Sequence, residues 1–225
     1  MELRTDIDVL DELGPWVGLS VVDVGSGRGV LARGLVALGA TVLAVEPDAA
    51  QRDVAETEQP VDGLRLVAGF GTALPAADAS QDAVIFNRSL HHIPILQMDA
   101  ALREGLRVLC PGGRLLVLEP DPDGQMSMVM APFHDEREVR GAAQAALDRL
   151  TLPSTEASYL RGYAFPDLPS FRARMAASTV IDADQGGLAS ALVTQRFSAG
   201  FDPTGEGEER YRFTNPIRLR IFTAR

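Results

Sequence analysis

The stretch VVDVGSGRGV, near the amino terminus, limits the possible folds of this chain more than any other feature. Residues 19–24 are apolar on both sides of an extended chain and predict a buried β-strand. Gly25, Gly27 and Gly29 follow, and residues 30–39 predict a helix that ends at a glycine. A strand, a glycine turn and a helix are typical of the start of an open α/β sheet, where the turn lets a ligand approach the backbone.

Strands and helices continue to alternate along the first half of the chain. Crossover connections of this kind predict a parallel sheet with helices on both faces, in a doubly wound order. The expected strands are 40–46, 64–69, 82–88 and 114–120, and the expected helices are 6–13, 48–57 and 98–110, with a Pro-Gly-Gly turn at 111–113.

The pattern loosens after residue 120. Residues 121–133 look like a loop, and their three methionines suit either a flexible substrate pocket or core filling. Glu119, Asp121 and Asp123 at its start are expected to be a solvated acidic cluster. Helices are predicted at 134–150, 169–177 and 187–199, and two antiparallel strands at 209–213 and 217–224, on either side of an Asn-Pro pair.

These elements predict the α/β fold class: a doubly wound, mostly parallel sheet of seven strands with an antiparallel C-terminal strand and a helical cap. We expect one domain over residues 1–225, because no linker or low-complexity segment interrupts it. Its expected parts are a cofactor-binding core at about 18–122, a cap at about 123–200 and C-terminal strands at about 207–225.

Composition excludes several classes of protein. The net charge of −10 argues against a nucleic-acid substrate, and the longest apolar run is too short to span a membrane. The acidic start is unlike a signal peptide, and Cys110 is the only cysteine, so we expect a cytoplasmic protein without an internal disulfide. All 21 basic residues are arginine, as in many proteins of GC-rich bacterial genomes, which excludes Schiff-base and P-loop lysines.

The residues at the strand ends indicate what the glycine turn binds. A dinucleotide fingerprint needs Gly or Ala at position 30, where this chain has Val30. Asp23 ends the first strand, where a carboxylate repels a pyrophosphate but attracts a cation. Glu46 ends the second strand and can accept hydrogen bonds from ribose hydroxyls. A ligand with a ribose and a positive charge, such as S-adenosylmethionine, matches this layout.

Four segments in order strengthen this interpretation: VVDVGSGRG, VEPD, GFGTALPAADASQDAVIFNRSLHHI and LRVLCPGGRLLVLEP. Through them the chain resembles the class I S-adenosylmethionine-dependent methyltransferases, especially the small-molecule branch that includes methyltransferase type 11-like proteins. The resemblance covers about residues 18–122. It implies a Rossmann-like methyltransferase fold, S-adenosylmethionine as cofactor and no metal ion.

The resemblance also implies a role for each matching residue. Asp23 would orient the methionine part of the cofactor, Glu46 would hold the ribose, and Asn87 would contact the amino-acid end. The residues that would pass beneath the cofactor or lie against its adenine are Gly25, Ser26, Gly27, Pro47, Phe70 and Gly71. Where relatives usually have Gly-Asp-Ala, this chain has Gly-Phe-Gly, so Phe70 cannot accept the hydrogen bond of the adenine amino group, although its ring can stack.

Methyl transfer needs alignment of the acceptor, exclusion of water and, for a hydroxyl acceptor, a base. His92 and His91 follow the fourth strand at the expected pocket mouth and are the candidate catalytic residues, with His92 favoured. His134, the third histidine, is expected to be exposed at the start of a helix.

We therefore predict an enzyme that methylates a small molecule, on oxygen by preference or on nitrogen, acting as a monomer or homodimer without nucleic-acid or membrane partners. The amine-methylating DPPY-like signature is missing after the fourth strand. Two alternatives remain open: an NAD-dependent Rossmann oxidoreductase, and a non-catalytic protein that binds S-adenosylmethionine.

Overall fold

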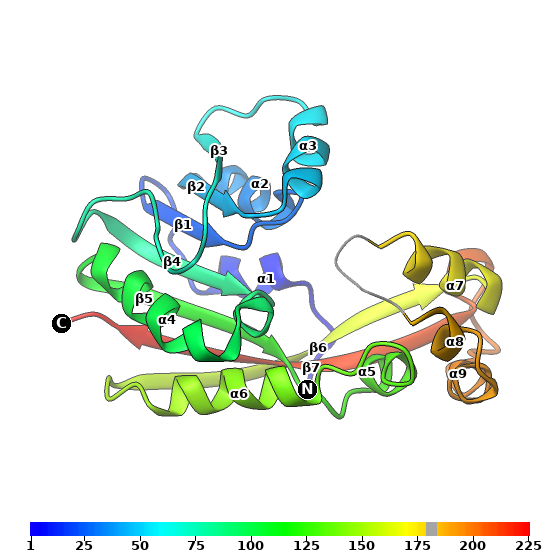
Figure 1. Ribbon diagram of the computed structural model, residues 1–225. Helices are drawn as coiled ribbons and strands as arrows, with labels where there is room; N and C mark the ends of the chain where they lie inside the picture. Colours follow the sequence, from blue (N-terminus) through cyan, green and yellow to red (C-terminus); the bar gives the residue numbers. More distant parts are fainter. Residues whose placement is uncertain (179–183) are drawn as a thin grey trace. The chain divides into compact units, whose positions relative to one another are not determined.

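The computed structural model describes residues 1–178 and 184–225, and within them the sheet has seven strands in the order β3-β2-β1-β4-β5-β7-β6 (Figure 1). The predicted α/β fold class is confirmed. The strands are β1 (Ser20–Val24), β2 (Thr41–Glu46), β3 (Leu64–Ala68), β4 (Gln81–Asn87), β5 (Leu109–Pro120), β6 (Ser154–Phe165) and β7 (Tyr211–Thr223).

Helices connect most of these strands, and their first residues explain where several of them begin. The α-helices are α1 (Asp6–Glu12), α2 (Val30–Ala37), α3 (Ala49–Thr57), α4 (Met98–Val108), α5 (Gln125–Met130), α6 (Arg137–Asp148), α7 (Leu168–Ala176), α8 (Gln185–Leu188) and α9 (Ala191–Ser198); the 3₁₀ helices are η1 (Leu90–His92), η2 (Ile95–Gln97) and η3 (Gly207–Glu209). Thr5 caps α1 and Asp48 caps α3, each by accepting a hydrogen bond from a backbone N–H of the first turn.

The first four strands and β5 are parallel, and their register aligns their carboxyl ends. Val24, the last residue of β1, lies beside Val45 of β2 and Phe86 of β4, and Glu46 lies beside Ala68 of β3. The residues that follow these strands therefore meet at one edge of the sheet, where ligands bind in open α/β folds.

The C-terminal strand is antiparallel, as predicted, but it is one strand and not two. The N–H of Asp121 donates to the carbonyl of Pro216, and the N–H of Ala224 donates to Gly113, so β7 runs opposite to β5. Burial alternates through the middle of β7, at Phe213, Asn215 and positions 217 and 219. The Asn-Pro pair thus continues a strand, and reading it as a turn was wrong.

The chain divides into two compact units. We call the first the sheet unit (Thr5–Glu119, Gly141–Ser158 and Arg218–Arg225) and the second the helical unit (Met1–Arg4, Pro120–Arg140 and Tyr159–Ile217). The expected single domain of residues 1–225 stays a prediction, and residues 179–183 of its expected cap lie outside the described residues.

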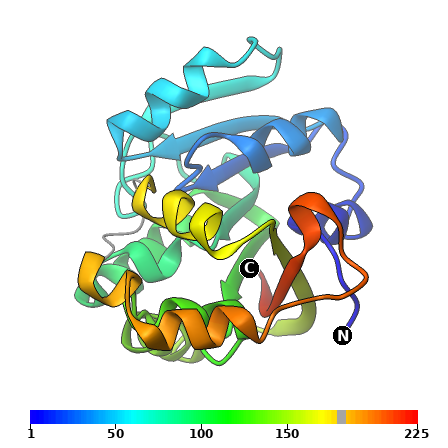
Figure 2. The same cartoon turned by 90° about the vertical axis from the view of Figure 1, so that its right-hand side faces the viewer.

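Each unit has its own apolar core. In the sheet unit, α4 and the second half of α6 pack on one face of the strands, around residues such as Val84, Phe86 and Leu102. Helices α2 and α3 contact β2 and β3 (Figure 1). In the helical unit, α9 contacts α5 and α7 (Figure 2), and Phe171 and Phe197 are fully buried in an aromatic cluster with ring centroids 5.0 Å apart.

Four features after α4 differ from the expectations of the sequence. Part of the expected loop 121–133 forms α5, whose Met126 and Val129 face the core of the helical unit. Strand β6 was not predicted, and the helix expected at 187–199 is divided into α8 and α9. Strand β5 begins five residues early, at Leu109, and includes the Pro-Gly-Gly segment.

Candidate cofactor-binding site

The glycine turn between β1 and α2 needs its glycines for two separate reasons. Gly25, Gly27 and Gly29 have φ angles of 70°, 55° and 74°, which L-residues with a side chain rarely adopt. In addition, a Cβ on Gly25 would lie 2.6 Å from the Cβ of Ser89, which is too close for any real contact. The turn therefore packs closely against the residue Ser89 that follows β4, and its three glycines place no Cβ on the backbone.

Asp23 is buried at the end of β1 with only 1% of its surface exposed. The pKa of Asp23 is raised from 3.8 to about 7, mainly by burial and in part by the negative charge of Glu46, while the positive charge of Arg88 opposes both effects. Its Oδ2 atom has no hydrogen-bond partner among the described residues. A buried acceptor of this kind is costly unless a donor or a cation satisfies it.

Glu46 connects the end of β2 to the glycine turn. Its Oε2 accepts a hydrogen bond of 2.8 Å from the N–H of Gly27, and its Oε1 accepts one of 2.8 Å from the N–H of Asp48. The carboxylate is buried and held in one orientation by these two donors. Each carboxylate oxygen has further acceptor capacity, so the group can still accept from a ligand hydroxyl.

The end of β3 presents an exposed aromatic ring. Phe70 is 65% exposed, and its backbone carbonyl accepts a hydrogen bond from Ala73 that closes a tight turn. Pro47 is exposed at the end of the neighbouring strand β2. Gly71 cannot take a Cβ without approaching Val24 and Ile93 to about 3 Å. These residues offer apolar surface that suits a flat ring system.

At the end of β4, Asn87 contacts a residue that the sequence did not single out. Its Nδ2 donates to the Oδ2 atom of Asp6 in α1 at 3.2 Å, while its Oδ1 is buried without a partner in the described part of the chain. The hydroxyl oxygen of Ser26 is also buried and unpaired there. With Asp23, three unpaired buried oxygens thus come from the ends of β1 and β4.

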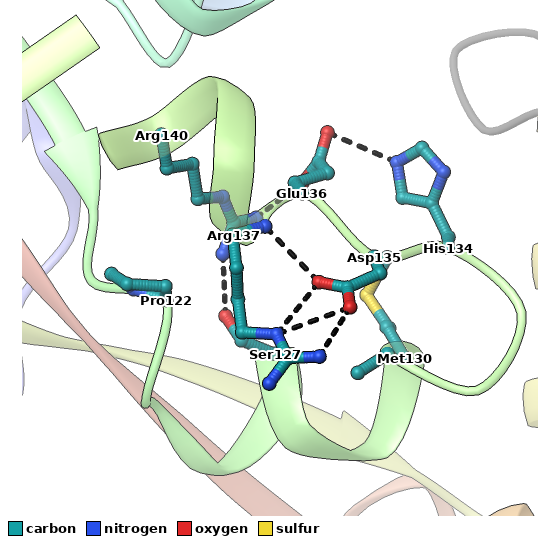
Figure 3. Close-up of a pocket in the computed structure, with 9 residues that line it drawn as sticks. Pro122, Ser127, Met130, His134, Asp135, Glu136, Arg137 and Arg140 are labelled. Carbon is teal, nitrogen blue, oxygen red and sulfur yellow. Dashed lines mark hydrogen bonds and ion pairs between the residues drawn. The ribbon is translucent and has the colours of Figure 1, made fainter. Parts of the chain in front are cut away.

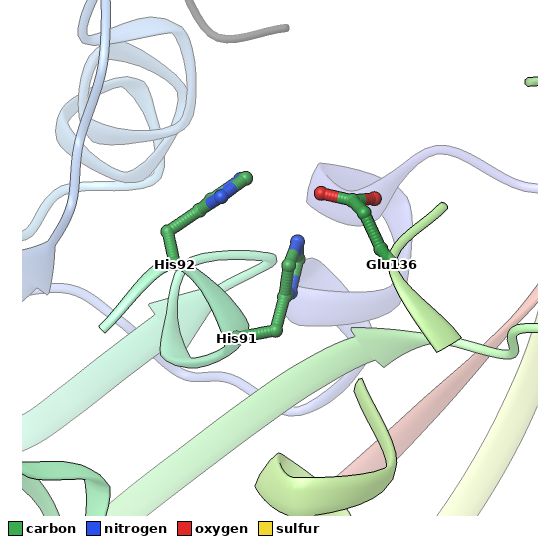
Figure 4. Close-up of side chains that lie close together, drawn as sticks. All are labelled: His91, His92 and Glu136. Carbon is green, nitrogen blue, oxygen red and sulfur yellow. The ribbon is translucent and has the colours of Figure 1, made fainter. Parts of the chain in front are cut away.

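His91 and His92, the candidate bases, have different surroundings on η1. Their rings lie side by side with centroids 4.1 Å apart (Figure 4). His91 is buried, and its Nδ1 makes a short hydrogen bond to Glu119, whose other oxygen accepts from the N–H of Leu90 at 3.0 Å. His92 is exposed. Glu119 itself is fully buried, so the expectation that it belongs to a solvated acidic loop was wrong.

The helical unit has a surface pocket of its own, and His134 and Met130 are among the residues that line it (Figure 3). His134 lies before α6, is only 18% exposed in its side chain, and pairs through Nε2 with Glu136 at 3.0 Å, so it is not the exposed helix start that we expected. Buried Arg140 donates to Glu136 and, at 2.6 Å, to the hydroxyl of Ser127. The pocket is thus lined by a polar network together with the apolar residues Pro122, Met130 and Ala131.

Comparisons with known proteins concern the part of the chain that contains this sheet edge. Residues 22–117 match a family described as a methyltransferase domain. The demethylmenaquinone methyltransferase of Beutenbergia cavernae is 40% identical over 111 residues, which is 49% of this chain and 44% of that protein. The ubiquinone/menaquinone biosynthesis C-methyltransferase of Roseobacter denitrificans is 35% identical over 136 residues, 56% of this chain and 54% of that protein. The chain spans about half the length of these curated relatives.

Similarity to a solved structure extends over nearly the whole chain. The YcgJ protein from Bacillus subtilis has a TM-score of 0.68 and an identity of 18%, and the match covers 97% of both chains. At this identity the similarity shows a common fold. Among the described residues, no helix is long and apolar enough to cross a membrane.

Proposed function

We propose that this chain, which through residues 22–117 belongs to the class I S-adenosylmethionine-dependent methyltransferases, transfers a methyl group from S-adenosylmethionine to a small molecule. One observation carries the proposal: the buried Asp23 carboxyl, with an unpaired oxygen, at the end of β1 beside the glycine turn. A phosphate would be repelled there, whereas the ammonium group of an amino acid would satisfy the oxygen.

The residues at the sheet edge fit the cofactor from one end to the other. The unpaired oxygens of Asp23, Ser26 and Asn87 suit the positively charged amino-acid end. The oriented carboxylate of Glu46 suits the two ribose hydroxyls. Phe70, with Pro47, suits the adenine ring, which it would contact by stacking.

When bound, S-adenosylmethionine supplies a methyl group that is activated by a positively charged sulfur. The protein then has to orient the acceptor, exclude water and, for a hydroxyl acceptor, take up its proton. We propose His92 for the proton, since it is exposed beside the strand ends, and His91 as an alternative. Glu119 would hold the Nδ1 atom of His91, which leaves Nε2 as the atom that exchanges a proton.

Oxygen remains our predicted acceptor atom, with nitrogen as the alternative. A carbon atom is a second candidate, because the relative from Roseobacter denitrificans is named a C-methyltransferase of quinone biosynthesis. Incubation with methyl-labelled cofactor and hydroxyl, amine and quinol acceptors, followed by product mass spectrometry, separates the three. Label in quinol ring products alone would reject oxygen and nitrogen.

Binding of S-adenosylhomocysteine, measured by calorimetry, tests the cofactor site directly. We expect Asp23→Asn and Glu46→Gln each to weaken binding by tenfold or more, because each removes a charge-assisted interaction worth about 1.5–3 kcal/mol. Glu58→Gln, at an exposed position after α3, is the matched control and should bind like the wild type. Unchanged affinity in both site variants would place the cofactor elsewhere.

The calorimetric and labelling experiments together distinguish the alternatives. Binding of NAD(H) and not of S-adenosylhomocysteine would favour an NAD-dependent oxidoreductase, and binding of S-adenosylhomocysteine without turnover of any acceptor would favour a non-catalytic role. The cytoplasmic location, the absence of a metal ion, the lack of nucleic-acid or membrane partners and the state as monomer or homodimer stay predictions.

A further inference from the structure

Arg88 follows β4 directly and has an unusual backbone conformation. Its φ angle is 56°, in the left-handed region that a residue with a side chain occupies at a cost of about 1–2 kcal/mol. Its N–H donates to the carbonyl of Leu118 at 2.7 Å, which holds this conformation in place. Strained residues of this kind cluster at ligand sites, where surrounding contacts maintain them.

The Arg88 guanidinium is held by one partner and keeps a donor unused. Its Nη2 lies 3.1 Å from the Oδ2 atom of Asp6, the same oxygen that accepts from Asn87. Its Nε is buried and, within the described residues, has no hydrogen-bond partner. A guanidinium has five N–H donors in a planar fork, so the pairing with Asp6 leaves donors for a second acceptor.

Arg88 and Asp23 place opposite charges at the ends of neighbouring strands. Strands β1 and β4 are paired, with Asp23 beside Ile85, two residues before Asn87. The positive charge of Arg88 reaches Asp23, since it lowers the pKa of that carboxyl against the effect of burial. An unused buried donor and an unpaired buried acceptor at one edge match a ligand that carries both charges.

We propose that Arg88 binds the carboxylate of the cofactor's amino-acid end, opposite the ammonium group that Asp23 binds. This inference rests on the proposed function, and Asp6 is its positioning residue, because one Asp6 oxygen orients both Arg88 and Asn87. A zwitterion, such as an amino acid, satisfies both groups at once. Arg88 therefore selects cofactors with an intact amino-acid carboxylate.

Calorimetry with two ligands tests the role of Arg88. The ligands are S-adenosylhomocysteine and its decarboxylated analogue, S-adenosyl-3-thiopropylamine, which keeps the amine and lacks the carboxylate. We expect the wild type to bind S-adenosylhomocysteine about 10- to 100-fold more tightly than the analogue, as for a charge-assisted hydrogen bond. Arg88→Gln should lose this preference by weakening only the first ligand. Arg103→Gln, on the exposed side of α4, should keep the preference and is the control.

The outcomes separate this inference from the proposed function. Equal affinity of the wild type for the two ligands overturns the role of Arg88 even if the variant fails to fold. An Arg88→Gln protein that loses both ligands in equal proportion also overturns it, since that result indicates a structural role through Asp6. If the wild type binds no S-adenosylhomocysteine at all, both proposals fail.

Asp6→Asn supplies the test of positioning. The amide keeps one oxygen for Asn87 and Arg88 but removes the charge that holds the guanidinium. We expect a loss of about three- to tenfold for S-adenosylhomocysteine and a smaller change for the analogue. Equal losses for both ligands would contradict positioning through Arg88.

Discussion

Asp23→Asn should stabilise the ligand-free protein at alkaline pH while it abolishes the charge that the cofactor needs. Asp23 is buried, and burial, together with the nearby charge of Glu46, raises its pKa from 3.8 to about 7. In the unfolded chain the carboxyl ionises near pH 4, whereas in the folded protein it keeps its proton until about pH 7. Ionisation of this group therefore opposes folding.

The size of the effect follows from the two pKa values. The native pKa of about 7 lies roughly three pH units above the unfolded value of 3.8, and each unit is worth about 1.4 kcal/mol, so the full cost is about 4 kcal/mol. Below about pH 4 the carboxyl is protonated in both states and does not lower the free energy of unfolding. As the pH rises from about 4 to 7 the free energy of unfolding falls, and above pH 7 it is lower by the full amount. Between pH 5 and pH 8 the expected change is about 3 kcal/mol.

Urea unfolding of both proteins at pH 5 and pH 8, without ligand, measures this change. An asparagine does not titrate, so any constant effect of its amide cancels when the two pH values are compared. The advantage of Asp23→Asn over the wild type should grow by about 3 kcal/mol between them. Asp62→Asn, at an exposed position, should show no such growth. Parallel pH dependences for the wild type and Asp23→Asn would refute the reasoning.

Three further substitutions test the packing of the same edge. Gly25→Ala should lower the free energy of unfolding by about 3 kcal/mol, because the new Cβ would lie 2.6 Å from the Cβ of Ser89 and the residue would keep a φ of 70°. Urea unfolding measures this change, and a midpoint equal to that of the wild type would contradict it. Phe70→Ala should weaken S-adenosylhomocysteine binding about two- to tenfold in calorimetry without changing stability, because the ring is 65% exposed; unchanged binding would remove the ring from the adenine site. Glu119→Ala should lower the free energy of unfolding by about 2–4 kcal/mol, because it leaves buried His91 and the N–H of Leu90 without their acceptor. A loss below about 1 kcal/mol in urea unfolding would show that Glu119 is not needed to satisfy these two groups.

The sequence predicted the parallel strands well because their patterns are strong and local. Strand β1 is apolar on both faces, and Asp48 and the glycines mark where helices begin or end. Strand β6 shows no apolar pattern of this kind, because it lies at the edge of the sheet and its first five residues are exposed. In β7 the alternating burial continues through Pro216, although an Asn-Pro pair is typical of a turn.

The site shows the same division between local and distant signals. Asp23 and Glu46 could be identified because each ends a recognisable strand. The contact between Asp6 and Asn87 joins residues 81 positions apart, and no local pattern marks Asp6 as part of a site. The pairing of His91 with Glu119 likewise spans 28 positions, so the sequence could offer both histidines but could not tell the buried one from the exposed one.

Several unfavourable features of this protein occur at one edge of the sheet. Asp23 is a buried acid with a raised pKa, and Arg88 has a left-handed backbone. Ser26 and Asn87 each bury an oxygen that has no partner in the part of the chain that the structure describes. Selection for folding stability alone would replace such groups, because many substitutions at these positions raise the free energy of unfolding. Their concentration at the carboxyl ends of β1 and β4 is explained if a zwitterionic ligand satisfies them together. The same groups that destabilise the ligand-free protein would then make the site selective for a zwitterionic ligand.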